Sequence, residues 1–250
     1  MIIESKDNKI IKYAKQIQDK KYAELFGECF LETEKIVFDC LEKLEIKTIL
    51  VANSFFDKFK ERLAGFEDKV FKISDTLAKG LSKTESGANI FAIAKIKKTP
   101  FDLSKNTVVL ENLQDPSNLG AIIRSALAFD FKNIIAINCC FAYSSKVIRS
   151  SMSYVFDINY QEMKFEDFKK FKNNNNICLY VADMGGENIN QIKNIKSPMA
   201  FVVGNEGKGV SREMKAVADK VVAIPMKNNV ESLNASVSAS IIMNLLNKGE

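Results

Sequence analysis

The sequence predicts an α/β protein with two domains, and three observations indicate this fold class. The chain has 250 residues, which is enough for two modest domains. Short apolar runs alternate with helix-like segments along its length. A stretch with three lysines and Pro100 separates two apolar runs and is typical of a linker. We therefore expect a smaller N-terminal domain over residues 1–97, a linker over 98–104 and a C-terminal domain over 105–250.

The N-terminal domain is expected to be a small α/β unit. Apolar residues spaced along 34–44, among them Ile36, Val37 and Leu44, share one helical face. We expect helices over residues 8–22, 34–44 and 54–63. We expect strands over residues 28–32, 48–52, 69–74 and 88–96.

The C-terminal domain has more continuously apolar strands, which favours a mostly parallel sheet covered on both faces. We expect its strands over residues 107–110, 133–138, 176–182, 199–203 and 220–224. We expect its helices over residues 118–129, 144–151, 165–173, 211–219 and 234–247. Ligands of such sheets bind beyond the carboxyl ends of the strands.

Composition excludes several kinds of chemistry. The chain has no histidine, which excludes histidine bases and metal sites that contain histidine. Its five cysteines form no C-x-x-C pair, so we expect no metal, and their odd number suits a reducing, cytoplasmic location. No stretch approaches 18 apolar residues, so we expect no membrane association. The net charge of +5 permits nucleic-acid binding without requiring it.

Three loops at strand ends carry the candidate site. In the first, Asp115-Pro116 stops a strand, and we expect Ser117 or Asn118 to cap the next helix. Asn118 then lies at the mouth of that helix and Arg124 nearly two turns further in. In an otherwise apolar helix, Arg124 either forms a structural ion pair with a carboxylate or reaches into a cleft.

The second and third loops each leave two interpretations open. Gly204, Gly207 and Gly209 follow an apolar strand, so they form either a ligand-binding backbone loop or only a tight turn. In the third loop, Ser232 is either a functional residue or only a helix N-cap. The helix that follows is rich in Ala and Ser, which allows close approach to a loop or to a second subunit.

The motifs of these loops resemble those of the SpoU/TrmH family of RNA ribose 2′-O-methyltransferases. They are Asn118-Leu-Gly-Ala-x-x-Arg124, Val203-Gly-x-Glu-Gly207 and Ile224-Pro-Met…Ser232-Leu-Asn234. The resemblance covers roughly residues 104–247 and implies a SPOUT fold with a deep trefoil knot. The N-terminal domain resembles, less closely, the ribosomal-protein-like RNA-binding domain of many members.

The resemblance also implies a homodimer that uses S-adenosyl-L-methionine. It implies that the cofactor is bound by Gly204, Asn205, Gly207, Ile224, Met226, Leu233 and Ala235. It implies catalytic roles for Asn118, Arg124, Glu206, Ser232 and Asn234, and a place for Arg149 near the RNA or the subunit interface.

The resemblance to the family implies that the arginine at position 124 is the general base. We expect a different role for it. Removing a proton from an arginine at pH 7 costs roughly 8 kcal/mol. We therefore expect Arg124 to hold the phosphate beside the target ribose. The remaining polar residues would orient the reacting groups, and alignment can supply roughly 7–11 kcal/mol of the barrier.

Two other functions stay open at this point. A non-catalytic dimeric RNA-binding protein would bind no cofactor. A nucleotide-binding enzyme would use residues 204–209 for phosphate, although no P-loop lysine position is present. The RNA target is open between ribosomal and transfer RNA, and the separate N-terminal domain favours RNA of the 23S type by family analogy.

Overall fold

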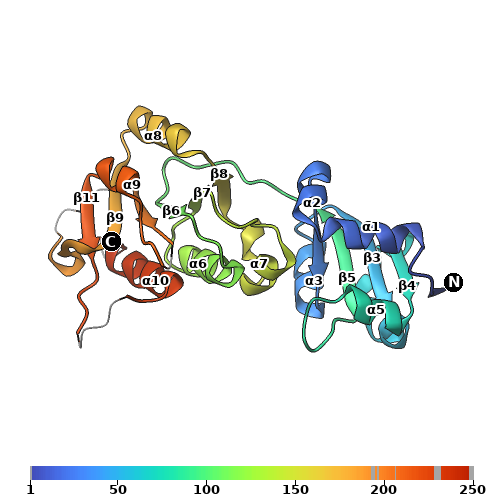
Figure 1. Ribbon diagram of the computed structural model, residues 1–250. Coiled ribbons are helices and arrows are strands. Elements are labelled where there is room, and N and C mark those ends of the chain that lie inside the picture. The colour runs from blue at the N-terminus through green and yellow to red at the C-terminus, as the bar shows by residue number, and fades with distance from the viewer. Residues whose placement is uncertain (1, 193–194, 196, 206, 228–231, 248–250) are drawn as a thin grey trace. The chain divides into compact units, whose positions relative to one another are not determined.

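The computed structural model describes residues 2–192, 195, 197–205, 207–227 and 232–247 (Figure 1). The chain divides into two compact units, one of residues 1–97 with 141–156 and one of residues 98–140 with 157–250. Each unit has its own β-sheet, so the predicted α/β fold class is confirmed.

The first unit is built on a mixed sheet with the strand order β1-β4-β3-β5-β2. Its strands are β1 (Ile2–Ile3), β2 (Glu28–Glu32), β3 (Ile46–Ala52), β4 (Val70–Ile73) and β5 (Ile90–Lys95). Its helices are α1 (Lys9–Ile17), α2 (Lys20–Phe26), α3 (Glu34–Leu41), α4 (Phe56–Phe59), α5 (Asp75–Leu81) and α7 (Ser145–Ser150). Strand β5 is antiparallel to both of its neighbours, and the other pairs are parallel.

Two predicted helices of this unit are wrong in extent. The segment 8–22 forms two helices, because the Asp19 side chain accepts a hydrogen bond from the Lys21 N–H and starts α2 anew. The segment 54–63 contains only the short α4 between 3₁₀ turns. Strand β1 and helix α5 were not predicted.

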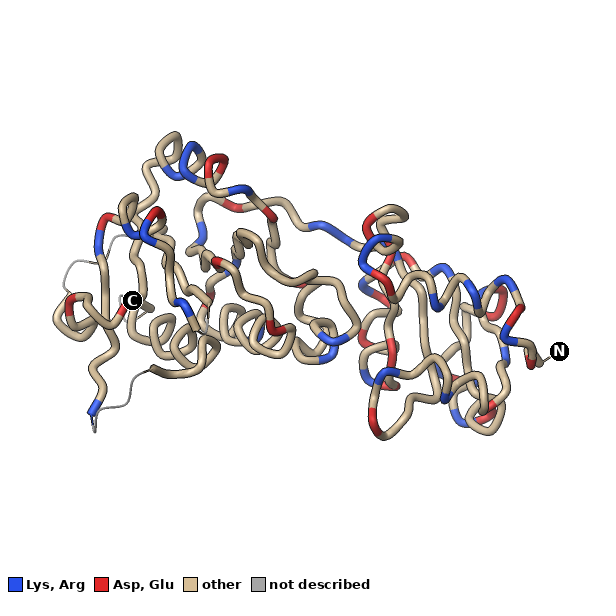
Figure 2. The backbone as a smooth tube through the Cα atoms, viewed as in Figure 1, with Lys and Arg blue, Asp and Glu red and all other residues tan. Residues whose placement is uncertain are grey.

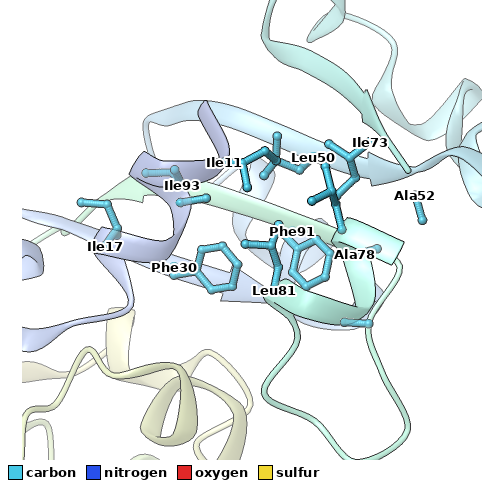
Figure 3. Packing of buried hydrophobic residues seen from close by; sticks show 13 residues of the cluster. Ile11, Ile17, Phe30, Leu50, Ala52, Ile73, Ala78, Leu81, Phe91 and Ile93 are labelled. Atoms are coloured by element: carbon cyan, nitrogen blue, oxygen red, sulfur yellow. The ribbon is translucent and has the colours of Figure 1, made fainter. Parts of the chain in front are cut away.

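The core of the first unit lies between its sheet and helices α1 and α5 (Figure 3). Phe30 and Phe91 stack there with ring centroids 5.6 Å apart. At the end of β2 the backbone is strained, because Thr33 has φ of +82°, a value that β-branched residues rarely adopt.

The second unit is built on a six-stranded sheet with the order β11-β9-β10-β6-β7-β8, and every pair in it is parallel. Its strands are β6 (Thr107–Glu111), β7 (Asn133–Ile137), β8 (Asn159–Glu162), β9 (Cys178–Asn188), β10 (Met199–Val203) and β11 (Lys220–Ala223). The predicted parallel sheet is confirmed, while β8 was not predicted. The strand order does not test the trefoil knot, which stays a prediction.

Helices cover both faces of this sheet, as the apolar strands predicted (Figure 1). Helices α8 (Phe165–Asn174) and α9 (Arg212–Ala216) bury Phe168 and Met214 against one face. Helices α6 (Pro116–Ala128) and α10 (Ala235–Leu246) pack against each other, and α10 also contacts β10. The small residues of α10 therefore approach another helix of the same chain.

The N-caps of these two helices differ from the expected ones. Asp115 caps α6, because its carboxylate accepts a hydrogen bond from the Ser117 N–H and Pro116 takes the first helical position. Asn118 consequently lies inside the first turn and is buried. Asn234 caps α10, so Ser232 is not its N-cap. No helix of the described ranges is long and apolar enough to cross a membrane.

Candidate functional site

A cavity of about 410 Å³ lies at the carboxyl edge of the parallel sheet, where the ends of β9, β10 and β11 meet. Its apolar lining consists of Ala182, Met184, Val203, Val222, Ile224, Met226, Leu233, Ala235 and Ile242. Its remaining described lining consists of Asp183, Gly204, Asn205, Gly207, Lys208, Gly209, Ser232 and Ser238. This volume and the mixture of an apolar lining with a few polar groups are typical of small-molecule sites.

The glycine loop after β10 forms one wall of the cavity. Asn205 and Gly209 close it with two backbone hydrogen bonds of 3.1 Å and 2.8 Å. Gly204 lies against this closure, since a Cβ on it would be 2.3 Å from the carbonyl carbon of Gly209. The loop is therefore built by close backbone packing that only glycine at position 204 allows.

The Asn205 side chain ties this loop to the one after β6. Its amide group donates a 3.0 Å hydrogen bond to the carbonyl of Asn112, and its oxygen accepts from the Gly207 N–H at 2.9 Å. At the far end of the loop, the buried Glu111 carboxylate accepts hydrogen bonds from the backbone N–H and the hydroxyl of Ser211 at 2.8 Å and 2.6 Å. Two consecutive residues at the end of β6 thus hold the glycine loop at both of its ends.

The first and third loops also meet. The Asn234 side chain donates a 3.0 Å hydrogen bond to the side-chain oxygen of Asn118. One helix turn or more further on, the hydroxyls of Ser125 and Ser240 are 2.7 Å apart. Motifs separated by more than 100 residues are therefore joined side chain to side chain.

The structure brings many of the predicted site residues together. The cavity is lined by Gly204, Asn205, Gly207, Ile224, Met226, Ser232, Leu233 and Ala235. Asn118, Arg124 and Asn234 are not among its lining residues. Glu206 lies outside the described residues.

Arg124 is exposed on α6. Among the described residues no carboxylate forms an ion pair with it, so the structural ion pair considered above is absent there. The guanidinium therefore faces solvent from an otherwise apolar helix.

Arg149 belongs to the first unit, on α7. It forms an ion pair with Glu32, whose side chain is fully buried. The Lys83 N–H donates to the same carboxylate at 2.9 Å. Burial lowers the pKa of Arg149.

Asp183 was not predicted as a site residue, although it is one of two charged groups in the described lining, together with Lys208. The Asp183 carboxylate accepts a 3.0 Å hydrogen bond from the Gly185 N–H and forms an ion pair with Lys215. The hydrogen bond from Lys215 holds the pKa of Asp183 below its ordinary value. It was missed because the strand was predicted to end at residue 182, whereas β9 continues to Asn188.

The described residues contain no cluster of three Cys, Asp or Glu side chains that could hold a metal ion. They do fit a nucleoside-like ligand such as S-adenosylmethionine. Apolar side chains of β10, β11 and α10 offer surfaces for a base, and the glycine loop offers backbone groups.

Comparisons with known proteins agree with this geometry. The profile of the SpoU rRNA Methylase family matches residues 105–244. An uncharacterized tRNA/rRNA methyltransferase of Borreliella burgdorferi is 31% identical over 169 residues, which are 65% of this chain and 70% of that protein. The 23S rRNA (guanosine(2553)-2′-O)-methyltransferase RlmP of Bacillus subtilis is 25% identical over 247 residues, 96% of this chain and 97% of that one. Several mycobacterial relatives match over only about 45% of their own length.

Among solved structures, the AdoMet-bound rRNA methyltransferase of Sinorhizobium meliloti superimposes with a TM-score of 0.86. It is 22% identical, and the match covers 98% of this chain and 97% of that chain. At this identity the likeness shows a shared fold over both units.

Proposed function

Because this chain belongs to the SpoU rRNA Methylase family, we propose that it methylates a ribose 2′-hydroxyl of structured RNA, and of 23S-type ribosomal RNA rather than tRNA. Membership of the family makes it an RNA methyltransferase that depends on S-adenosyl-L-methionine. The ribose and the 23S target are supported by RlmP, which the chain matches along nearly its whole length.

The observation that carries the proposal is the cavity at the sheet edge. Four chain segments between residues 182 and 242 contribute to it, and eight of the residues implied by the family motifs are among them. S-adenosylmethionine supplies an activated methyl group when bound. The protein then has to hold the cofactor and an RNA hydroxyl in line, and such alignment is worth roughly 7–11 kcal/mol of barrier.

We assign the backbone of Gly204, Ile224 and Leu233 to the adenosyl part of the cofactor. Asn205, Gly207, Met226 and Ala235 would complete the pocket. Asn118 and Asn234 share a hydrogen bond, and we assign them with Glu206 and Ser232 to orienting the reacting groups.

Arg124 would hold the phosphate next to the target ribose. Its exposure and the absence of a described carboxylate partner leave the guanidinium available to RNA. Single-turnover methylation by Arg124→Lys and Arg124→Ala across pH tests this role. A titrating group that disappears only in these variants would instead identify Arg124 as the base.

A homodimer through α6 and α10 is part of the proposal. Helix α10 carries no charged residue and α6 carries only Arg124 (Figure 2). Val237 of α10 is 46% exposed, so its side chain is accessible for a contact with a second subunit. Light scattering of Val237→Lys against the wild type tests this interface. We place Arg149 near the RNA or this interface, the N-terminal domain on the RNA, and the enzyme in the cytoplasm without a metal.

Mapping of ribose methylation in total RNA, with and without the gene, tests the function directly. The proposal expects one 2′-O-methyl mark in ribosomal RNA to disappear. Loss of a mark in tRNA would overturn the ribosomal target, and loss of a base methylation would overturn the ribose. Calorimetry with S-adenosylmethionine tests the alternative of a non-catalytic RNA-binding protein, which would show no binding.

A further inference from the structure

One charged side chain of the cavity has no role in the function proposed so far. Asp183 lies in the middle of β9, where the strand bulges away from its neighbours. On the β10 side the pairing ends at Val181, and on the β11 side the register jumps from Val181 to Glu187. Residues 182–186 therefore bulge out of the ladder at the edge of the cavity, and Asp183 lines it.

A close backbone contact fixes this bulge. A Cβ on Gly186 would lie 2.6 Å from backbone atoms of Val222 in β11, so the chain returns to the sheet there by a close backbone approach that only glycine allows. The bulge is thus pinned at both ends, and the carboxylate that it carries is positioned by the fold.

The carboxylate itself is held on both of its oxygens. One oxygen accepts from the Gly185 N–H at 3.0 Å, and the other pairs with Lys215 of α9. Each carboxylate oxygen can accept a second hydrogen bond. The side chain is 28% exposed, so it keeps access to a ligand in the cavity.

The ion pair decides which ligand group this carboxylate suits. Lys215 compensates its charge locally, which weakens recognition of a distant positive charge such as a sulfonium. Hydrogen-bond acceptance is kept, and an acceptor-only carboxylate suits a pair of hydroxyl donors. Carboxylates recognise the ribose hydroxyls of dinucleotides in the same chemical way.

We propose that Asp183 accepts hydrogen bonds from the ribose hydroxyls of the adenosyl cofactor and that Lys215 holds it in place for this contact. The inference rests on the function proposed above for the cavity. Asp183 is then a binding residue that selects for an intact ribose. Because S-adenosylmethionine and S-adenosylhomocysteine carry the same ribose, Asp183 should contribute equally to the binding of both.

Calorimetry with S-adenosylhomocysteine and its 2′-deoxy and 3′-deoxy derivatives tests this. We expect the wild type to lose about 10- to 150-fold in affinity when the contacted hydroxyl is removed, as for a hydrogen bond to a charged group. Asp183→Asn should bind S-adenosylhomocysteine more weakly by a similar factor, and should discriminate against the deoxy derivative less than threefold.

Asp219→Asn is the matched control. Asp219 also pairs with a lysine, Lys172, and accepts a backbone N–H, that of Leu179, but it precedes β11 and lies beside the amino end of β9. This variant should bind all three ligands as the wild type does. Lys215→Met keeps the carboxylate but removes the group that holds it, so discrimination against the deoxy derivative should fall below that of the wild type and stay above that of Asp183→Asn.

Three results would overturn the inference. The first is a wild type that binds the deoxy derivatives as tightly as the parent, which requires no variant at all. The second is an Asp183→Asn variant that discriminates like the wild type. The third is an Asp183→Asn variant that loses affinity for S-adenosylmethionine but not for S-adenosylhomocysteine, since this would mean that Asp183 recognises the positive charge of the sulfonium. If the wild type discriminates between hydroxyls but methylates no RNA ribose, the proposed function fails while this inference stands.

Discussion

Replacing Gly204 with alanine should disrupt the glycine loop from within. The new Cβ would be 2.3 Å from the carbonyl carbon and oxygen of Gly209 and 2.5 Å from the backbone nitrogen of Val210. All three are backbone atoms, so no flexible side chain can move aside. An ordinary contact begins at 3.4 Å, and the loop closure must therefore open by about 1 Å.

Overpacking of this kind costs about 1–3 kcal/mol of unfolding free energy. A displacement of 1 Å at a site that depends on alignment can also lower the rate about 100-fold. We expect Gly204→Ala to lower the free energy of unfolding by this amount and to weaken binding of S-adenosylhomocysteine. Urea unfolding followed by circular dichroism measures the first, fitted with one transition per unit, and calorimetry measures the second.

Gly207→Ala is the control for stability, because it lies in the same loop and its Cβ would meet only the Asn205 side-chain oxygen at 3.6 Å. We expect its free energy of unfolding to change by less than about 0.5 kcal/mol. Equal stability of the two variants would refute the reasoning, since it would show that the closure between Asn205 and Gly209 is not rigid.

Three further predictions follow from strain and buried charge. Thr33→Gly should raise the free energy of unfolding by about 1 kcal/mol in urea titrations. It relieves a φ of +82°, and the threonine side chain makes no capping hydrogen bond that would be lost. A loss of stability would mean that the side chain matters more than the strain. Glu111→Gln should cost about 1–3 kcal/mol in the same titration, because the buried carboxylate accepts two hydrogen bonds from the start of α9; an unchanged midpoint would contradict this. The pKa of Asp183 is lowered by Lys215, so its stabilising contribution is complete above the unfolded value of about 4 and is lost as pH falls through the lower folded value. The difference in unfolding free energy between the wild type and Asp183→Asn should therefore shrink below about pH 4. A difference independent of pH would contradict the stabilising ion pair between Asp183 and Lys215.

The parallel sheet was predictable because its strands are buried on both faces and are therefore continuously apolar. Strand β8 was not, since two of its four residues, Gln161 and Glu162, are exposed at the edge of the sheet. Helix α5 was not predicted, and Gly80, a poor helix former, lies within it.

The loops of the candidate site were predictable because Gly, Pro and Asn, which favour turns, follow the ends of the strands. The contacts that join them were not. The hydrogen bond between Asn118 and Asn234 depends on where α10 packs, which local sequence does not contain. Asp183 was missed because the strand was predicted to end at residue 182, whereas β9 continues beyond a bulge and returns against the backbone of Val222 at Gly186.

The cavity has a consequence for the order of events during synthesis. Its described walls come from residues 182–184, 203–205, 207–209, 222–226 and 232–242, so a growing chain lacks part of the pocket until the first half of α10 has been made and packed. A ligand that binds only the finished pocket stabilises only molecules that have passed this last step. The cofactor would thereby act as a selective stabiliser of fully assembled enzyme, and protection from proteolysis by S-adenosylhomocysteine would appear only in chains that include α10.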